Sequence, residues 1–471
     1  MPSIRDFKGQ ISNAEPIDVP PGGAVEQMNL STTKGGVLQV RKGIQPATFT
    51  RPATSSGSAY RTFQRLSFCK TRFGDLLGVN GIDRGFRWDG LTANVELLGI
   101  EAPAAAPTVV GASGGAATAG DYIFAYRYID NTLPDPIPSS ISPFTTVTAT
   151  ANQKFNWTLP GTGPARATHV ELWRSVSGGT NVLYRIATIT LATTTYTTDT
   201  SSDATLNAFA DEDTLLVLLE DGSLNARRFV PPPNDRAFVK MFQDRYWYFG
   251  TVRYTRGTVT TNGTTTLTGS GTDWVSTLAY RYIAIDGEPA PIKVTAVGSG
   301  TSLTLATAAT TSASGKSYVI YPSPETRRTA FYSETDEPES VPQTNTVTIQ
   351  ENTGDDDEIV GGMPRGAYLY ILMDRHKYAL SFVRQPRIDA SVVMIDDRGA
   401  FNDACWGYLE ETAYLMDDQG PYSFNGVQST PIGMQIQNLW RKDTDGQRID
   451  FSKKAKFHVA VDRVRERIYF F

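Results

Sequence analysis

The chain has 471 residues, of which 40% are hydrophobic and 20% charged, and these values exclude wholesale disorder. Its 44 Lys and Arg against 49 Asp and Glu give a net charge of −5, which argues against tight nucleic-acid binding through a basic field but not against a passive wall past which nucleic acid slides. Three His and two Cys nearly exclude a zinc site or a disulfide framework. Cys69 and Cys405 form either one bridge or, as we expect, two buried free thiols.

The N-terminal residues 1–7 contain no apolar segment typical of a signal peptide. No run of about 18 apolar residues is present, so we expect no membrane span. The sequence therefore predicts a protein made in a cytosol.

Short alternating or apolar runs, separated by Gly, Asn, Asp and Pro, predict an all-β chain. An aromatic content of 11% also favours strands. Only residues 24–30, after two prolines and two glycines, have a spacing that allows one or two helical turns. Residues 101–119 are rich in Ala, Pro, Gly and Thr and predict an exposed connection.

Two segments have compositions of their own. Residues 120–203 contain five strand-like runs, which predict a small sandwich. The first is the aromatic run Tyr122–Tyr128, and the others are at residues 155–159, 169–174, 182–189 and 196–199. Residues 254–322 are rich in Thr, Gly and Ser, and Asn262-Gly263 between two β-branched runs predicts a hairpin. The low charge of the second segment leaves a low-complexity region as the alternative to a folded β unit, although apolar and polar residues alternate in its strand-like runs.

The remaining segments share a hairpin of the form aromatic-x-aromatic-(Asp/Asn)-Gly, found at residues 86–90 and 422–426. A related turn followed by an aromatic strand occurs at residues 244–249 and 374–378. Such units are typical of propeller blades, which bury their aromatic faces only against neighbouring blades. We therefore expect these segments to converge, with the two other segments as insertions. Separate β domains in a row are the alternative.

Two sequence motifs imitate catalytic ones. Gly315-Lys316-Ser317 matches the end of a phosphate-binding loop, but Thr310 stands where that motif requires Gly. Residues 111–115 fit G-x-S-x-G without the required strand and helix, so we expect a flexible linker there.

The acidic and basic candidates are equally weak. Residues 355–358 form an acidic run, which we interpret as a solvated turn rather than a Ca²⁺ site. A glycosidase-type pair would have to come from Asp135, Asp199, Asp336, Glu337 and Glu339, which we expect in turns and at blade edges. His169 and His376, the latter beside Lys377, lack a nucleophile signature and are expected on strand faces. The short basic clusters Arg227-Arg228 and Lys453-Lys454-Lys456 are expected at the solvated surface.

Several segments, in order, resemble the podovirus tail nozzle proteins, also called tail tubular protein B or head-to-tail stabilisation proteins. The N-terminal match is carried by Phe7-Lys8-Gly9, residues 17–24, Met28-Asn29-Leu30 and residues 36–43. Residues 328–342 and 405–426 resemble the blade motifs of that family. Residues 172–179 resemble its fibronectin-III-like insertion, and residues 269–305 resemble a small β module common in phage virion proteins.

This resemblance implies a β-propeller-like body made from residues 1–102, 205–253 and 325–471. It implies a fibronectin-III-like insertion at 103–204 and a small β-barrel-like insertion at 254–324. The implied function is a non-enzymatic virion component, a homohexameric ring below the portal and adaptor that retains and passes genomic DNA without sequence-specific binding. Tail fibres or tailspikes are further partners that it allows. No catalytic, cofactor-binding or metal-binding residue is assigned.

Two other functions are kept as alternatives. The first is a glycan- or receptor-binding phage adhesin that uses exposed aromatics such as Trp157, Trp173 and Trp274, and the second is a propeller glycosidase. The sequence stops at Phe471 inside an expected strand, so either the chain continues or closure uses the N-terminal strands.

Overall fold

A computed structural model of the chain describes residues 30–32, 38–40, 65–90, 95–132, 136–164, 166–179, 182–208, 215–217, 230–322, 326–342, 344–349, 357–384, 388–433, 440 and 449–471. The fold is all-β, as the sequence predicts, and the one α-helix within this described part is α1 (Asp203–Ala208). The chain divides into two compact units, residues 1–50 and 51–471.

In the first unit, β1 (Leu30–Thr32) pairs in antiparallel fashion with β2 (Leu38–Val40). Of the segment expected to be helical, residues 24–29 lie outside the described residues, and Leu30 begins a strand instead.

The second unit contains a series of four-stranded antiparallel sheets, which we call the body. The described residues form four such sheets. The first contains β3 (Ser67–Lys70), β4 (Leu76–Val79), β5 (Phe86–Trp88) and β6 (Glu96–Leu97), and the second contains β16 (Phe238–Phe242), β17 (Arg245–Phe249), β25 (Thr329–Tyr332) and β26 (Thr346–Thr348). The third contains β27 (Ile359–Arg365), β28 (Tyr368–Met373), β29 (Lys377–Arg384) and β30 (Ile388–Asp396), and the fourth contains β31 (Trp406–Leu409), β32 (Thr412–Asp417), β33 (Gly420–Phe424) and β34 (Ser429–Pro431). The hairpin β35 (Val459–Asp462) and β36 (Arg467–Phe470) follows.

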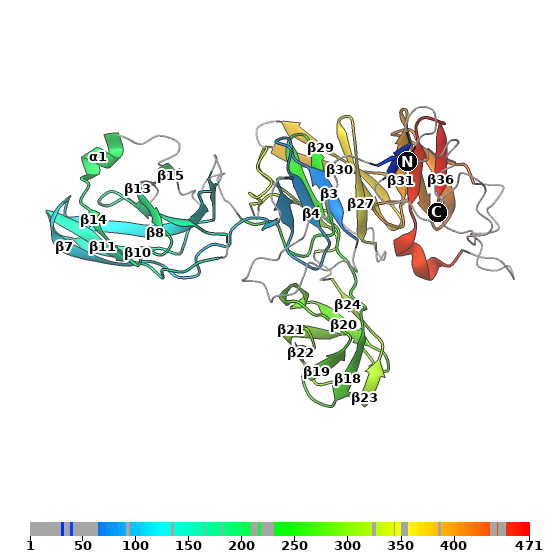
Figure 1. Cartoon of the computed structure of the whole chain (residues 1–471), viewed down its shortest axis with the longest axis horizontal. Coiled ribbons are helices and arrows are strands. Elements are labelled where there is room, and N and C mark those ends of the chain that lie inside the picture. Colours follow the sequence, from blue (N-terminus) through cyan, green and yellow to red (C-terminus); the bar gives the residue numbers. More distant parts are fainter. Residues whose placement is uncertain are drawn as a thin grey trace. The chain divides into compact units, whose positions relative to one another are not determined.

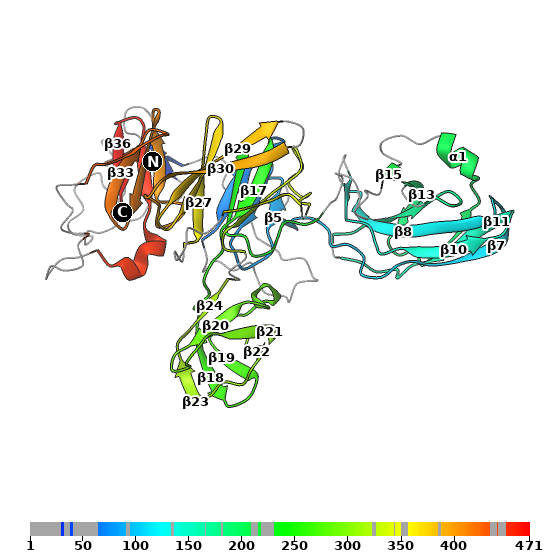
Figure 2. The ribbon, with the colours of Figure 1, turned by 180° about the vertical axis from the view of Figure 1, so that it is seen from behind.

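Apolar clusters join each body sheet to the next in chain order. Leu77 of the first sheet packs in one cluster with Tyr248 of the second. Phe249 of the second sheet packs with Leu369 of the third, and the third and fourth sheets share a core that includes Tyr422. Figure 2 shows β5 and β17 of the first two sheets side by side. Four-stranded sheets packed in succession are the arrangement expected of blades.

The repeated aromatic hairpins occupy equivalent places in this body. Residues 86–90 begin with β5 and residues 422–426 begin within β33, and each of these is the third strand of its sheet. The related segment at 244–249 forms the second strand β17 of the second sheet. The aromatic side chains of β17 and β33 supply much of the apolar clusters between sheets, and Phe86 of β5 is fully buried.

A sandwich follows the first body sheet (Figure 1). One of its sheets contains β7 (Thr108–Ala117), β11 (Gln153–Thr158) and β14 (Thr195–Asp199), and the other contains β8 (Gly120–Asp130), β9 (Ile137–Pro138), β10 (Thr145–Ala149), β12 (His169–Arg174), β13 (Val182–Thr190) and β15 (Leu215–Val217). Their facing side chains, including Tyr122, Phe155 and Trp157, form one core. Strand β15 pairs with β13, although residues 205–253 were predicted to belong to the body.

The expectation of a linker at residues 101–119 and of a flexible loop at 111–115 is wrong for β7. Gly111 and Gly115 pair beside β11, where an added Cβ on Gly115 would meet the backbone oxygen of Gln153. Small residues fill this strand because the neighbouring backbone lies so close, and their composition imitates a loop.

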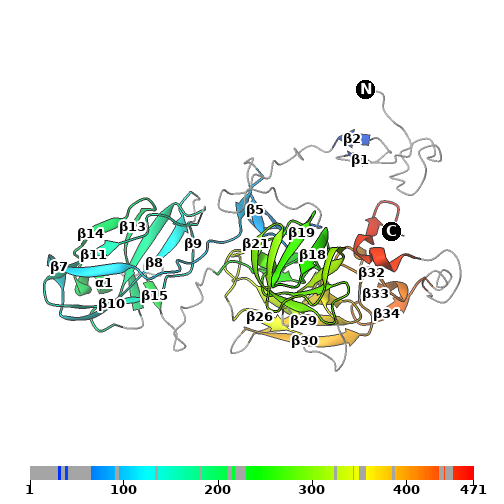
Figure 3. The same ribbon diagram turned by 90° about the horizontal axis from the view of Figure 1, so that it is seen from below.

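The second insertion is a curled seven-stranded sheet, visible in Figure 3 around β18, β19 and β21. It contains β18 (Thr258–Asn262), β19 (Thr266–Ser270), β20 (Tyr282–Ile285), β21 (Ile292–Ser299), β22 (Ser302–Leu305), β23 (Ser312–Lys316) and β24 (Tyr318–Tyr321). The hairpin predicted at Asn262-Gly263 is confirmed, since β18 pairs with β19 and Gly263 has a φ of 72°. The low-complexity alternative is wrong, because Trp274, Ile283 and Leu303 are buried in one core.

The chain enters and leaves each insertion at neighbouring points. Tyr254 and Ile320 form a β-bridge with two reciprocal backbone hydrogen bonds at the base of the curled sheet. At the base of the sandwich, a Cβ on Gly99 would lie 2.8 Å from Cα of Pro231. The second body sheet therefore forms from residues on both sides of the curled sheet, as in the pairing of Tyr248 with Phe331, and across the sandwich the first body sheet packs against the second.

Candidate functional site

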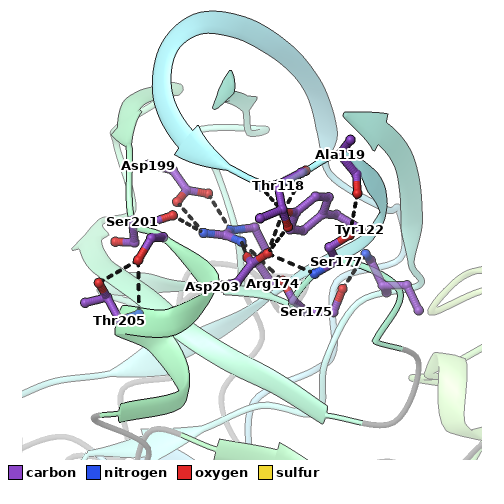
Figure 4. Close-up of polar contacts among 12 residues, drawn as sticks. Thr118, Ala119, Tyr122, Arg174, Ser175, Ser177, Asp199, Ser201, Asp203 and Thr205 are labelled. Carbon is purple, nitrogen blue, oxygen red and sulfur yellow. Dashed lines mark hydrogen bonds and ion pairs between the residues drawn. The ribbon is translucent and has the colours of Figure 1, made fainter. Parts of the chain in front are cut away.

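A polar cluster with a fully buried centre lies at one end of the sandwich, around Arg174 (Figure 4). Arg174 is the last residue of β12, Asp199 is the last residue of β14, and Asp203 begins α1. The Arg174 guanidinium, which is 0% exposed, lies with Nε 3.2 Å from Asp199 Oδ2 and Nη1 3.2 Å from Asp203 Oδ1. Nη2 donates a hydrogen bond of 2.9 Å to the carbonyl oxygen of Ser201. The Arg174 side chain thus connects the end of β12 with the end of β14 and the start of α1.

Aromatic and hydroxyl groups complete this cluster. The guanidinium carbon of Arg174 lies 5.2 Å from the ring centres of both Tyr122 and Phe155. The Tyr122 and Thr118 hydroxyls donate to Asp203 Oδ2 at 2.8 and 2.5 Å, and these bonds lower the pKa of Asp203 although burial acts in the opposite direction. Such a filled and paired cluster is suited to holding strand ends together.

Asp199 is the member of the cluster whose charged form is disfavoured by burial. Burial raises the pKa of Asp199 above its ordinary value, and the attraction of Arg174 only partly opposes this. Trp157 Nε1 also donates to Asp199 Oδ2, at 3.3 Å. Because a buried carboxylate without its cation is strongly destabilising, Arg174 and Asp199 depend on each other.

A second network, centred on Arg166, joins the sandwich to the body. Arg166 Nε lies 3.0 Å from Asp130 Oδ2 in the sandwich, and Nη2 lies 3.1 Å from Glu96 Oε2 in the first body sheet. Its Nη1 is hydrogen-bonded to Glu339, which lies between β25 and β26 of the second body sheet. Arg87 Nη1 contacts the same carboxylate at 3.1 Å. We call these five residues the junction network.

The junction network is electrostatically coupled. Burial alone would lower the pKa of Arg166, but Glu339 and Glu96 outweigh it, so the pKa of Arg166 is raised. Burial raises the pKa of Glu96, and Asp130 and Glu339 add to this effect while Arg166 opposes it. Arg166 is therefore the shared cation that holds the carboxylates of the sandwich and of the body together at this junction.

A third buried cation lies between the third and fourth body sheets. Lys377 is 0% exposed, and its Nζ lies 3.1 Å from Asp396 Oδ1 and 4.1 Å from the ring centre of Phe424. Burial lowers the pKa of Lys377, and Asp396 acts against this. Lys377, named in the sequence only as the neighbour of His376, is thus a contact between neighbouring sheets.

The acidic candidates do not form a catalytic pair in the described residues. Asp199 pairs with Arg174 in the sandwich, Asp336 Oδ2 lies 2.9 Å from Arg72 Nη1, and Glu339 belongs to the junction network. Glu337 forms a backbone bridge with Glu334. Asp135 lies outside the described residues.

The acidic run at 355–358 is only partly described, and its solvated-turn interpretation is wrong for Asp357. Residues 355 and 356 lie outside the described residues. Asp357 is 4% exposed, and its Oδ2 lies 2.7 Å from His376 Nδ1. Burial raises the pKa of Asp357, and the hydrogen bond from His376 opposes the rise. His376 therefore has a carboxylate partner that its sequence context did not indicate.

The other motifs occupy ordinary strand or surface positions. Gly315 and Lys316 end β23, and no phosphate-binding loop is formed there. His169 belongs to β12, with Nδ1 3.0 Å from Thr168 Oγ1. Lys454 Nζ pairs with Asp374 at 3.2 Å, and Lys456 is exposed. Arg227 and Arg228 lie outside the described residues.

The three tryptophans proposed for glycan binding are not exposed. Trp157 and Trp173 are each 1% exposed, and Trp274 is 2% exposed. Trp157 and Trp274 belong to the cores of the sandwich and the curled sheet, and Trp173 packs with Ala125 and Leu183. The adhesin alternative therefore loses the residues on which it was based.

Both cysteines are free, as expected, although only Cys405 is buried and Cys69 is half-buried. Burial raises the pKa of Cys405 to about 12. The described residues contain no cluster of three or more His, Cys, Asp or Glu side chains that could hold a metal ion. Among them, too, no helix has the length and apolar character needed to cross a membrane.

No sequence pattern indicated Arg166, Arg174 or the burial of Lys377. The only available signal for the last two was their place in strand-like runs, and alternation did not indicate their burial, because both faces of these strands are buried. A charged side chain at an inward position predicts a buried partner, but the sequence does not say which carboxylate supplies it.

The chain matches no model of a known protein family, and no curated protein is similar to it. Its functional interpretation therefore depends on the fold, the buried networks and the sequence motifs.

Proposed function

We propose that this chain is a structural component of a bacteriophage tail, a nozzle subunit that assembles into a ring around a DNA channel. The observation that supports it most is the continuity of the body across two insertions. Strand β17 pairs with β25 although the whole curled sheet lies between them in sequence. Likewise β16 lies beside the first body sheet although the sandwich separates them.

Such a body suits a subunit that must keep its shape under mechanical stress. Ion pairs and aromatic cores link its parts, as in the contact of Lys240 Nζ in the second sheet with Oδ2 of Asp403, which precedes the fourth sheet, at 2.7 Å. The junction network ties the sandwich to this body. A rigid subunit of this kind can form closed rings through its sides.

The net charge of −5 agrees with a conduit that does not hold DNA tightly, because every phosphate contact would add friction. On this proposal the ring is a homohexamer that contacts an adaptor protein, and the insertions project from it. Tail fibres or tailspikes are candidate partners of the insertions. The subunit itself catalyses no reaction.

Mass photometry of the purified chain, followed by negative-stain imaging, tests this proposal. A ring subunit gives particles of a defined multiple of 51.5 kDa with a central hole. Monomers that bind sugar in a glycan array would instead support the adhesin, and monomers without either property would refute both functions.

A further inference from the structure

Residues 451–471, which we call the basic segment, differ in charge from the rest of the chain. They contain six Lys and Arg against two Asp and Glu, a net charge of +4, whereas the whole chain has a net charge of −5. The segment consists of the 3-10 helix η4 (Phe451–Lys456) and the hairpin β35–β36. Positive charge gathered on one element of an acidic chain indicates an anionic partner for that element.

One face of the hairpin packs on the body and the other face is exposed. An added Cβ on Gly407 of β31 would lie 2.5 Å from Cγ2 of Val461, and Phe470 packs against the core that the third and fourth sheets share. Because successive side chains of a strand point to opposite faces, Arg467 and Tyr469 lie on the face away from this core. Both side chains are exposed. The body therefore supports the hairpin from behind.

The exposed face carries a row of stacked aromatic rings. The ring centres of His458 and Phe471 lie 4.6 Å apart with an interplanar angle of 14°, and the ring centre of Tyr469 lies 6.2 Å from that of Phe471. Tyr469 and Phe471 are 37% and 43% exposed. Stacking fixes these rings relative to one another, so the neighbouring cations are presented from an ordered surface.

Asp462 orders the turn between the two strands. Its Oδ1 accepts hydrogen bonds of 3.1 Å from the backbone N–H groups of Val464 and Arg465, and its Oδ2 lies 3.8 Å from Arg465 Nη1. Val464, at the tip of the turn, is 85% exposed. One of the two carboxylates of the basic segment is thus used within the turn, and Glu466 is the other.

Three cations of the basic segment are available to a partner. Lys456, Arg463 and Arg467 are exposed, and none of them has a carboxylate partner among the described residues. Lys454 and Arg465, by contrast, each pair with an aspartate. Arg463 and Arg467 flank the turn, and Lys456 precedes the first strand, so the three lie along one hairpin.

We infer that this hairpin contacts the phosphates of double-stranded DNA through Lys456, Arg463 and Arg467. A two-stranded β-ribbon is one of the elements that the major groove of DNA admits, and guanidinium and ammonium groups bind phosphate oxygens. The other residues of the chain have a net charge of −9, the difference between −5 and +4, which disfavours DNA elsewhere.

This contact rests on the proposed function and gives it a DNA-facing element. Three phosphate contacts per copy make a weak site, because non-specific affinity grows with the number of phosphates that are neutralised. Phosphate contacts also carry no sequence information. A conduit that retains DNA and later releases it requires a contact of this kind.

The salt dependence of DNA binding tests the inference. Fluorescence anisotropy of a labelled duplex of about 20 base pairs measures its affinity for the full-length chain between about 50 and 200 mM salt. Three phosphate contacts predict an affinity that falls at least about 40-fold over this range. A chain with Arg463→Gln and Arg467→Gln keeps one contact of three, so the slope of log affinity against log salt should fall to about one-third.

Two further variants set the sign and the control. Glu466→Gln removes the remaining exposed carboxylate of the turn and should tighten binding at low salt. A chain with Lys70→Gln and Lys293→Gln loses the same charge from two exposed residues outside the basic segment and should keep the wild-type slope. Circular dichroism of every variant confirms that the fold is retained.

The contrary results are distinct. An unchanged slope in the double arginine variant, or wild-type chains that bind no duplex at about 50 mM salt, would overturn the assignment and favour an acidic protein surface as the partner of the hairpin. Tighter binding of the single strand would indicate bases stacked on Tyr469 and Phe471 and would overturn the choice of duplex. Mass photometry reports the ring separately, so hairpin-dependent DNA binding by chains that remain monomeric would support this contact and refute the ring.

Discussion

At the scale of single residues, the fold depends on buried cations with several partners. Arg174, Arg166 and Lys377 each join segments that are distant in sequence. Each is satisfied by carboxylates, and Arg174 and Lys377 also lie over aromatic rings. Such clusters specify which strand ends meet, because any other pairing leaves a buried charge uncompensated.

Replacing Arg174 by Met should destabilise the sandwich by about 3–5 kcal/mol, because it leaves Asp199 buried without a cation. Hydrogen exchange of the β12 and β14 amides measures the loss. The control Arg185→Met removes a half-exposed partner of Glu171, which keeps Arg127 at 2.5 Å, and should cost less than about 1 kcal/mol. Equal losses in the two variants would contradict the role of Arg174.

The hydrogen bonds of Glu288 predict how the stability of the curled sheet changes at acidic pH. Its carboxylate accepts hydrogen bonds from the hydroxyl groups and backbone N–H groups of Thr310 and Thr311, which lower its pKa to about 2. A lowered folded-state pKa contributes stability above the ordinary value of 4.5, and this contribution is lost as pH falls toward about 2.

Glu288→Gln should therefore reduce the pH dependence of unfolding between those two values, and thermal melts of the two chains over this range measure the difference. Glu410→Gln, at an exposed turn, serves as the control. An unchanged pH profile in the Glu288 variant would show that the hydrogen bonds do not persist in solution.

At the scale of elements, strands with a local signal, such as β8 and β18, could be predicted from the sequence, whereas β7 was predicted to be a loop. The alternation of Tyr122 to Tyr128 and the Asn262-Gly263 hairpin are local signals, and both are confirmed. Strand β7 was missed because its glycines are selected by the closeness of Gln153, a contact between residues about 40 apart in sequence. Local composition carries no information about such an approach.

Glycines in β27 set the spacing of the body sheets. An added Cβ on Gly361 would lie 2.8 Å from Cα of Asp403, so Gly361→Val should cost about 1–3 kcal/mol through overpacking. Urea unfolding measures the cost. Gly300→Ala, where the nearest atom would be at 3.5 Å, should be tolerated, and a similar cost at both positions would contradict the close packing of β27.

At the scale of the whole molecule, the central feature is that both insertions begin and end at neighbouring points of the body. The aromatic repeats and the composition shifts predicted which segments converge. They could not predict Glu339, Arg166 and Arg87 as the junction, because three separate segments supply them. The same signals predicted that the sandwich ends at residue 204, before β15. This strand has only three residues, which is too short for a recognisable strand pattern.

Removal of the complete sandwich tests its status as an insertion. Residues 103–229 are replaced by a short Gly/Ser linker, which is feasible because Gly99 and Pro231 are neighbours. Glu339 then loses Arg166 but keeps Arg87 and the backbone N–H of Gly99 at 2.5 Å. We expect particles of the same copy number in mass photometry. Loss of assembly in a folded variant would mean that the sandwich is part of the ring.

The most direct test of the central claim is a cryo-EM map of the purified full-length chain. We expect a closed ring with a central channel, in which β17 and β25 pair within each copy and consecutive body sheets pack in chain order. A map of single copies, or one in which the body segments form independent globules, would contradict it.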